Sequence, residues 1–223
     1  MPNSNGPAAE QIMQIRETLL MMASLADRNL ALAMRALVER DEKLAAAVEA
    51  EDSQLDQLEI NVDDMVINHM ATHAPVATDC RFMLVASKIS SNLERIGDAA
   101  VSIVRRSLEL NREPLLKPLI DIPRMAQIAE GMMRDSFTAL VDHKPELAQE
   151  IVRRDKEVDA INKQLARELT SFMLENPTTI TRAMNLTLVA RSLERIADHA
   201  KNIAEEVYYL YHAIDIRHER SSV

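Results

Sequence analysis

One short motif occurs twice in this chain. Glu-Arg-Ile-Gly-Asp at 94–98 returns as Glu-Arg-Ile-Ala-Asp at 194–198, a shift of 100 residues in a chain of 223. A second motif, Asp-Ser-Gln-Leu-Asp at 52–56, returns as Asp-Lys-Glu-Val-Asp at 155–159. Two motifs that recur in the same order and at nearly the same distance indicate an internal repeat. The sequence therefore predicts two copies of one structural unit.

A proline-containing segment separates the two copies. Pro114, Pro118 and Pro123 follow one another closely. A proline inside a helix removes a backbone hydrogen bond and clashes with the preceding turn, so no continuous helix is expected here. We therefore expect a first repeat at 1–112, a linker at 113–122 and a second repeat at 123–223.

The composition favours helices in both repeats. Only 3 residues are glycine, 47% are apolar and 27% are charged. Good helix formers dominate, and the alternating patterns typical of strands are few. Long helical segments joined by short connections form antiparallel bundles. We expect an all-α protein of two tandem three-helix bundles, with helices at about 10–39, 41–73, 75–110, 123–142, 144–175 and 177–214.

Charge and cysteine content exclude several classes of protein. A net charge of −9 argues against a nucleic-acid partner, which would require a basic surface. The N-terminus lacks the charged and apolar regions of a signal peptide, and no apolar run approaches the roughly 18 residues of a membrane span. Cys80 is the single cysteine, so no intrachain disulfide is expected. These features predict a cytoplasmic protein, with Cys80 at an ordinary helical position rather than acting as a nucleophile.

The repeated motifs predict two clusters of carboxylates. If the chain folds back at Pro75, Asp56 lies 19 residues before the turn and Glu94 lies 19 residues after it. At a rise of about 1.5 Å per residue, such positions reach the same height on adjacent antiparallel helices. The same counting around Pro177 applies to the second repeat. The predicted clusters are Asp52, Asp56, Glu94 and Asp98, and Asp155, Asp159, Glu194 and Asp198.

The position of these carboxylates predicts metal sites on the outside of the bundle. The apolar stripe that includes Leu93 and Ile96 faces the core, and Glu94 and Asp98 lie on the opposite side of the same helix. All-oxygen sites suit Mg, Mn, Fe or Ca, and Zn less naturally. Four carboxylates also exceed the charge of one divalent ion, so a multinuclear cluster is expected. A solvated acidic face is the alternative that the spacing leaves open.

Together these motifs resemble those of the PhoU family. The doubled Glu-Arg-Ile-Gly/Ala-Asp, the upstream Asp-x-x-x-Asp and the ending Tyr208-Tyr-Leu-Tyr211 followed by Asp215-Ile-Arg-His218 carry the resemblance, which extends from about Glu10. It implies a cytoplasmic negative regulator of phosphate uptake and of the phosphate regulon, without catalytic activity. It also implies that all eight acidic positions bind surface metal clusters, with iron and zinc among the ions.

The same resemblance implies protein partners. A phosphate ABC transporter and a two-component sensor histidine kinase are the expected partners, with this chain bridging them and reaching the membrane only through them. A homodimer is the expected assembly. The tyrosines at 208, 209 and 211 could anchor a partner, since tyrosine is favoured at interfaces, or could pack the last helix against the first.

Two other functions are compatible with parts of the pattern. A metal-independent helical adaptor would use the acidic faces to meet basic partner surfaces. A carboxylate-bridged di-iron enzyme would require Glu-x-x-His motifs that project inward. In this chain the acids are four residues apart and are expected to face outward, and no histidine lies three residues after a glutamate. The pattern therefore favours the adaptor over the enzyme.

Overall fold

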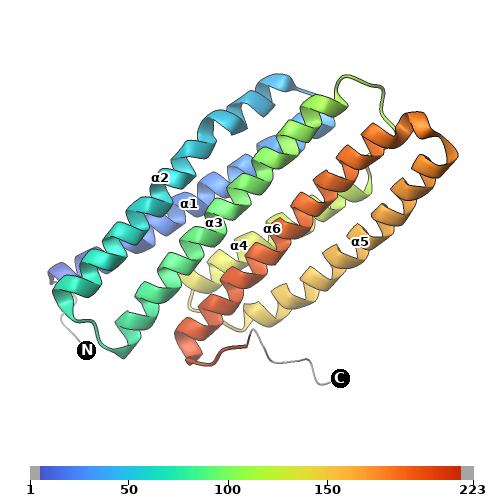
Figure 1. The fold of residues 1–223 in the computed structure, drawn as a ribbon. Coiled ribbons are helices and arrows are strands. Elements are labelled where there is room, and N and C mark those ends of the chain that lie inside the picture. The colour runs from blue at the N-terminus through green and yellow to red at the C-terminus, as the bar shows by residue number, and fades with distance from the viewer. Residues whose placement is uncertain (1–5, 217–223) are drawn as a thin grey trace.

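Six long helices make up the part of the chain that the structure describes. The computed structural model describes residues 6–216 (Figure 1). It contains α1 (Pro7–Glu39), α2 (Glu42–His73), α3 (Ala77–Leu110), α4 (Asp121–Val141), α5 (Leu147–Glu175), a short 3-10 turn η1 (Pro177–Thr179) and α6 (Ile180–His212), and no strand within that range. The all-α prediction is confirmed. None of these helices is long and apolar enough to cross a membrane.

Helix boundaries follow local chemistry. The Asp41 carboxylate caps α2 by accepting hydrogen bonds from the backbone N–H groups of Lys43 at 2.8 Å and Leu44 at 3.4 Å. α4 begins two residues earlier than expected, because Pro123 lies in its first turn, where a missing N–H removes no intrahelical bond. α5 begins later than expected, because a turn in which the N–H of Leu147 bonds the carbonyl of Lys144 precedes it.

The two repeats pack side by side through α3 and α6. Figure 1 shows α3 and α6 adjacent at the centre, with α2 and α5 on the outer sides. α1 packs on α2 and α3, α4 packs on α5 and α6, and α1 meets α4 only sparsely. Lys88, near the start of α3, bonds Glu206, near the end of α6, so the two central helices are antiparallel. This arrangement relates the two repeats by an approximate twofold axis.

Polar contacts cross the α3–α6 seam. The Lys88 ammonium lies 3.1 Å from a carboxylate oxygen of Glu206, which is buried. The Asn92 amide oxygen lies 2.9 Å from Nδ1 of His199 and accepts a bond of 3.4 Å from the Asn202 amide. Because polar groups in a buried interface require defined partners, these contacts fix how the two repeats align.

The interdomain linker is held at one end of the molecule by two arginines. Arg40 donates to the backbone carbonyls of Leu110, Asn111 and Glu113 at 2.7–3.1 Å. Arg182 donates to the carbonyl of Pro114 at 3.1 Å. These charged donors satisfy carbonyls that the proline-containing segment leaves without helical partners.

Gly97 allows α2 to approach α3 closely. A Cβ added at this position would lie 2.5 Å from Cδ1 of Leu55, which is fully buried. In the second repeat, Ala197 occupies the position of Gly97, and Val158 occupies that of Leu55. The methyl group gained on one helix is thus matched by a shorter side chain on the other. The first repeat uses a glycine with a larger neighbour to fill the same space.

This complementarity predicts a coupled effect on stability. Gly97→Ala alone is expected to lower the free energy of unfolding by about 1 kcal/mol, because overpacking costs about 1–3 kcal/mol and outweighs the gain in helix propensity. Leu55→Val combined with Gly97→Ala should lose less than the sum of the two single variants. Urea denaturation of the four proteins measures this coupling. If the loss of unfolding free energy in the double variant equals the sum of the losses in the two single variants, the proposed coupling between positions 55 and 97 is wrong.

Candidate metal centre

The first acidic cluster lies between α2 and α3. It comprises Asp52 and Asp56 from α2 and Glu94 and Asp98 from α3. Asp52 reaches α3, because its Oδ1 lies 3.9 Å from where a Cβ of Gly97 would be. Burial raises the pKa of Asp52, and the charges of Asp56 and Asp98 raise it further. The structure therefore brings the four carboxylates of the first repeat near one another, as the hairpin counting predicts.

Glu94 is more deeply buried than Asp98, its neighbour in the first cluster. Its side chain is 15% exposed, whereas that of Asp98 is 44% exposed. Burial raises the pKa of Glu94 to about 7, the charge of Asp98 adds to this shift, and Arg95 opposes it. Arg95 Nε comes within 3.2 Å of Glu94 Oε2, but the buried Oε2 accepts no hydrogen bond. That oxygen is available to a cation.

The second acidic cluster contains a cation of its own. It comprises Asp155 and Asp159 from α5 and Glu194 and Asp198 from α6. Lys201 Nζ lies 2.7 Å from Asp155 Oδ2 and 2.7 Å from Asp198 Oδ1. Burial lowers the pKa of Lys201, but the hydrogen bonds that its ammonium donates to Asp155 and Asp198 outweigh this effect and raise the pKa, so the ammonium stays charged. The second cluster is thus partly neutralised by the chain itself.

Sequence reasoning missed Lys201, although the repeat contains the signal. The residues after the doubled motif are Asp-Ala-Ala-Val at 98–101 and Asp-His-Ala-Lys at 198–201. Val101, which occupies the position of Lys201, is 3% exposed and apolar. Comparing the two copies for differences, as well as for identities, would have identified this lysine.

Neither cluster is closed around an ion in this arrangement of side chains. Across residues 6–216, no three His, Cys, Asp or Glu side chains converge closely enough to hold a metal. The donor set itself suits hard or borderline divalent cations. Both clusters sit on helical backbones, with two acids four residues apart on each helix of the hairpin.

The C-terminal tyrosines pack within the molecule. The three tyrosines at 208, 209 and 211 are partly buried against the core. The hydroxyl of Tyr211 donates to the carbonyl of Leu140 in α4 at 2.9 Å. The expectation that they pack the last helix against the first is therefore wrong for Tyr211, because within the second repeat the end of α6 lies beside the end of α4. His218 lies outside the described residues.

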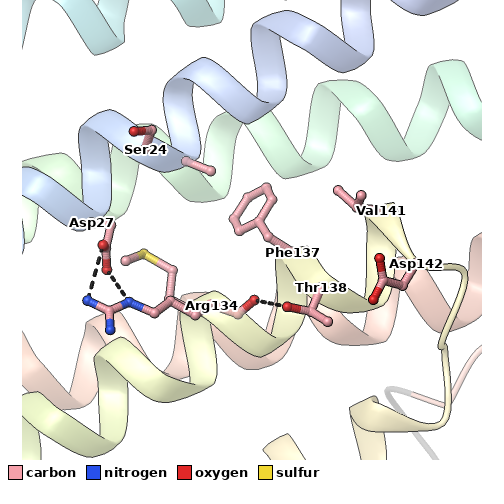
Figure 2. A pocket seen from close by; sticks show the side chains of 9 residues that line it. Ser24, Asp27, Arg134, Phe137, Thr138, Val141 and Asp142 are labelled. Carbon is pink, nitrogen blue, oxygen red and sulfur yellow. Dashed lines mark hydrogen bonds and ion pairs between the residues drawn. The ribbon is translucent and has the colours of Figure 1, made fainter.

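A groove between α1 and α4 lies away from both clusters. It encloses about 360 Å³ and is lined by Ala23, Ser24, Asp27, Met133, Arg134, Phe137, Thr138, Val141 and Asp142 (Figure 2). Figure 2 shows Asp27 and Arg134 bonded across it, at 3.1 and 3.2 Å. Asp142 is paired with Lys144. The charged side chains that line this groove are already paired with one another or with Lys144. The groove therefore presents mainly apolar surface and no candidate catalytic or metal-binding group.

Comparisons with known proteins agree on one family. The family model described as "PhoU domain" matches residues 19–107 and 122–207, once in each repeat. The "Phosphate-specific transport system accessory protein PhoU homolog" of Pseudomonas putida is 35% identical over 93% of this chain and 82% of its own length. The protein of the same description from Aquifex aeolicus is 37% identical over 94% and 95%.

Solved structures share the fold. The crystal structure of PhoU from Pseudomonas aeruginosa superposes with a TM-score of 0.89 and 34% identity, covering 92% of this chain and 99% of that chain. The phosphate transport system regulatory protein PhoU from Streptococcus pneumoniae gives a TM-score of 0.85 at 21% identity, covering 94% and 99%. At that lower identity, the second match bears on the fold alone.

Because the pKa of Glu94 is raised, replacing its carboxyl group is expected to increase the stability of the protein by an amount that depends on pH. Unfolded Glu94 ionises near its ordinary pKa of 4.5, whereas in the folded protein its pKa is about 7. The folded state is therefore penalised progressively as pH rises from about 4.5 to 7, and fully above 7. In chelator, Glu94→Gln should be more stable than the unmodified chain at pH 8, with a smaller advantage at pH 5.

Thermal unfolding at both pH values checks this expectation. Glu175→Gln, at an exposed position near the end of α5, is the matched control and should show no pH-dependent gain. A Glu94→Gln variant whose stability relative to the unmodified chain does not change between pH 5 and pH 8 would contradict the assigned burial and repulsion.

Proposed function

This chain belongs to the PhoU family, and on that premise we propose that it is an accessory protein of a phosphate-specific transport system and a negative regulator of phosphate uptake. The observation that carries this proposal is the match of the family model to both repeats. Relatives described as accessory proteins of phosphate-specific transport align over more than nine-tenths of this chain. The proposed role is one of binding, carried out in the cytoplasm.

The partners that this role requires are a phosphate ABC transporter and a sensor histidine kinase. Bridging them would keep the kinase inactive while phosphate is plentiful. The long helices, joined by polar contacts between α3 and α6, would provide a rigid scaffold for bridging two partners. A homodimer would present each binding surface twice. The acidic clusters flank that seam, since Arg95 and Arg195, one from each doubled motif, both influence the pKa of His199 there.

Deletion of the gene tests the regulatory role. In phosphate-rich medium, a reporter under a phosphate-starvation promoter should be active in the deletion strain and silent in the parent. Returning the unmodified chain should restore silence. A reporter that stays silent in the deletion strain would contradict negative regulation.

The metal role that we propose belongs to the first acidic cluster. Asp52, Asp56, Glu94 and Asp98 would hold one or more divalent ions, with Fe, Zn, Mn and Mg as candidates. The buried Glu94 oxygen without a hydrogen bond and the mutual repulsion of the acids support this proposal. A bound ion would neutralise those charges and tie α2 to α3. It need supply no reaction chemistry.

Metal content tests this role directly. The protein, purified without a metal-affinity tag, is expected to contain metal by elemental mass spectrometry, and Glu94→Gln/Asp98→Asn should reduce that content severalfold. Asp142→Asn/Glu146→Gln is the matched control, because it removes an exposed acid pair with the same four-residue spacing. Equal metal in both double variants would contradict a site at the first cluster.

A metal-independent adaptor is the second candidate. The lack of three converging ligands among residues 6–216 favours it. In an adaptor, the acids would contact a basic partner surface directly. Neutralising Glu94 and Asp98 would then weaken partner binding in the presence of chelator, whereas in a metal-dependent protein chelator alone would reproduce the defect.

A further inference from the structure

The two acidic clusters differ in one side chain that changes their chemistry. In the second cluster, Lys201 extends from α6 and donates to Asp198 on its own helix and to Asp155 on α5, at 2.7 Å each. The Asp155 side chain is 11% exposed and that of Lys201 is 21% exposed, so water screens these bonds poorly. The ammonium therefore bridges two helices through two carboxylates.

The first cluster has no such bridge among the described residues. Val101 stands where Lys201 stands in the second repeat, and it is buried and apolar. Arg95 lies 3.2 Å from Glu94 and 3.5 Å from Asp98, both on its own helix, and its side chain is 53% exposed. Arg105 bonds Glu49 at 3.0 Å, outside the cluster. The charge of Arg105 partly opposes the repulsion that Asp56 and Asp98 exert on Asp52. Among residues 6–216, however, no cation bonds Asp52 and Asp98 together as Lys201 bonds Asp155 and Asp198.

We propose that the two clusters are functionally unequal, with a divalent metal ion at the first cluster and Lys201 in place of the ion at the second. This inference rests on the metal role proposed for the first cluster and adds a separate assignment for the other. A metal ion entering the second cluster would meet a fixed positive charge and would have to break two short, charge-assisted bonds. An ion entering the first cluster would meet four carboxylates and Arg95, whose side chain is 53% exposed and bonds no acid of α2.

The packing of the α2–α3 hairpin would then respond to metal, whereas the packing of the α5–α6 hairpin would not. Contact between α2 and α3 would depend on metal supply, whereas contact between α5 and α6 would persist without it. Any signal carried by metal would thus act on the first repeat alone.

Neutralising the lysine provides the test. Lys201→Met keeps the aliphatic stem and removes the charge, whereas Lys201→Arg keeps a cation at the position. Metal-free proteins, checked for helical content by circular dichroism, are loaded with MnCl₂ or ZnCl₂, desalted and analysed for metal per chain. Asp155→Asn/Asp198→Asn is made in the unmodified chain and in the Lys201→Met background.

We expect the metal content per chain to increase only in Lys201→Met. Its metal content should rise about twofold over that of the unmodified chain, Lys201→Arg should show no rise, and Asp155→Asn/Asp198→Asn should remove the gain. In the unmodified chain, the same asparagine pair should leave metal content unchanged.

Two failures are distinguishable. Metal lost from the unmodified chain on Asp155→Asn/Asp198→Asn, or no gain in a metal-containing Lys201→Met protein, overturns the inequality while the proposed metal role stands. Absence of metal from every variant overturns both the proposed metal role and the inference.

Discussion

Repulsion between carboxylates that two packed helices bring together is the constraint on which the rest of this structure depends. Like charges four residues apart destabilise an isolated helix by about 0.2–0.5 kcal/mol, and partial burial between helices increases that cost. The close approach of α2 and α3 at Gly97 places Asp52 beside Asp98. A cation bound between such carboxylates would reduce their repulsion and so stabilise the packing of the two helices.

The two repeats accommodate this repulsion in different ways. In the second repeat, Lys201 supplies the cation from within the chain. In the first repeat, Glu94 keeps a raised pKa and a buried oxygen without a hydrogen bond. The antiparallel seam of α3 and α6 joins the two hairpins in one body.

Much of the fold could be predicted from the sequence, because the internal repeat and the helix-favouring composition both extend over the whole chain. The two bundles followed from the doubled motifs and the proline-containing linker, and the approach of Asp56 to Glu94 followed from counting residues around Pro75. The partner of Tyr211 could not be predicted, because it depends on how the three helices of the second repeat pack, which places Leu140 of α4 beside the last helix. The start of α5 depends on a local turn that proline position alone does not specify.

The candidate site was only partly predictable. The acidic positions follow from the repeat, but the occupant of the second cluster does not, because one substitution, valine to lysine, changes a cluster that needs a cation into one that contains it. The pairing of Gly97 with Leu55 likewise became evident only once the helices were placed. A repeat in the sequence predicts common architecture, and departures between its copies show where the two halves differ in chemistry.

Hydrogen exchange of the metal-loaded and chelator-treated protein tests the central claim most directly. Removing metal is expected to increase exchange in α2 and α3 around residues 52–56 and 94–98. Exchange around residues 155–159 and 194–198 should stay unchanged, because Lys201 holds α5 to α6. Increased exchange at both clusters, or at neither, would contradict the account.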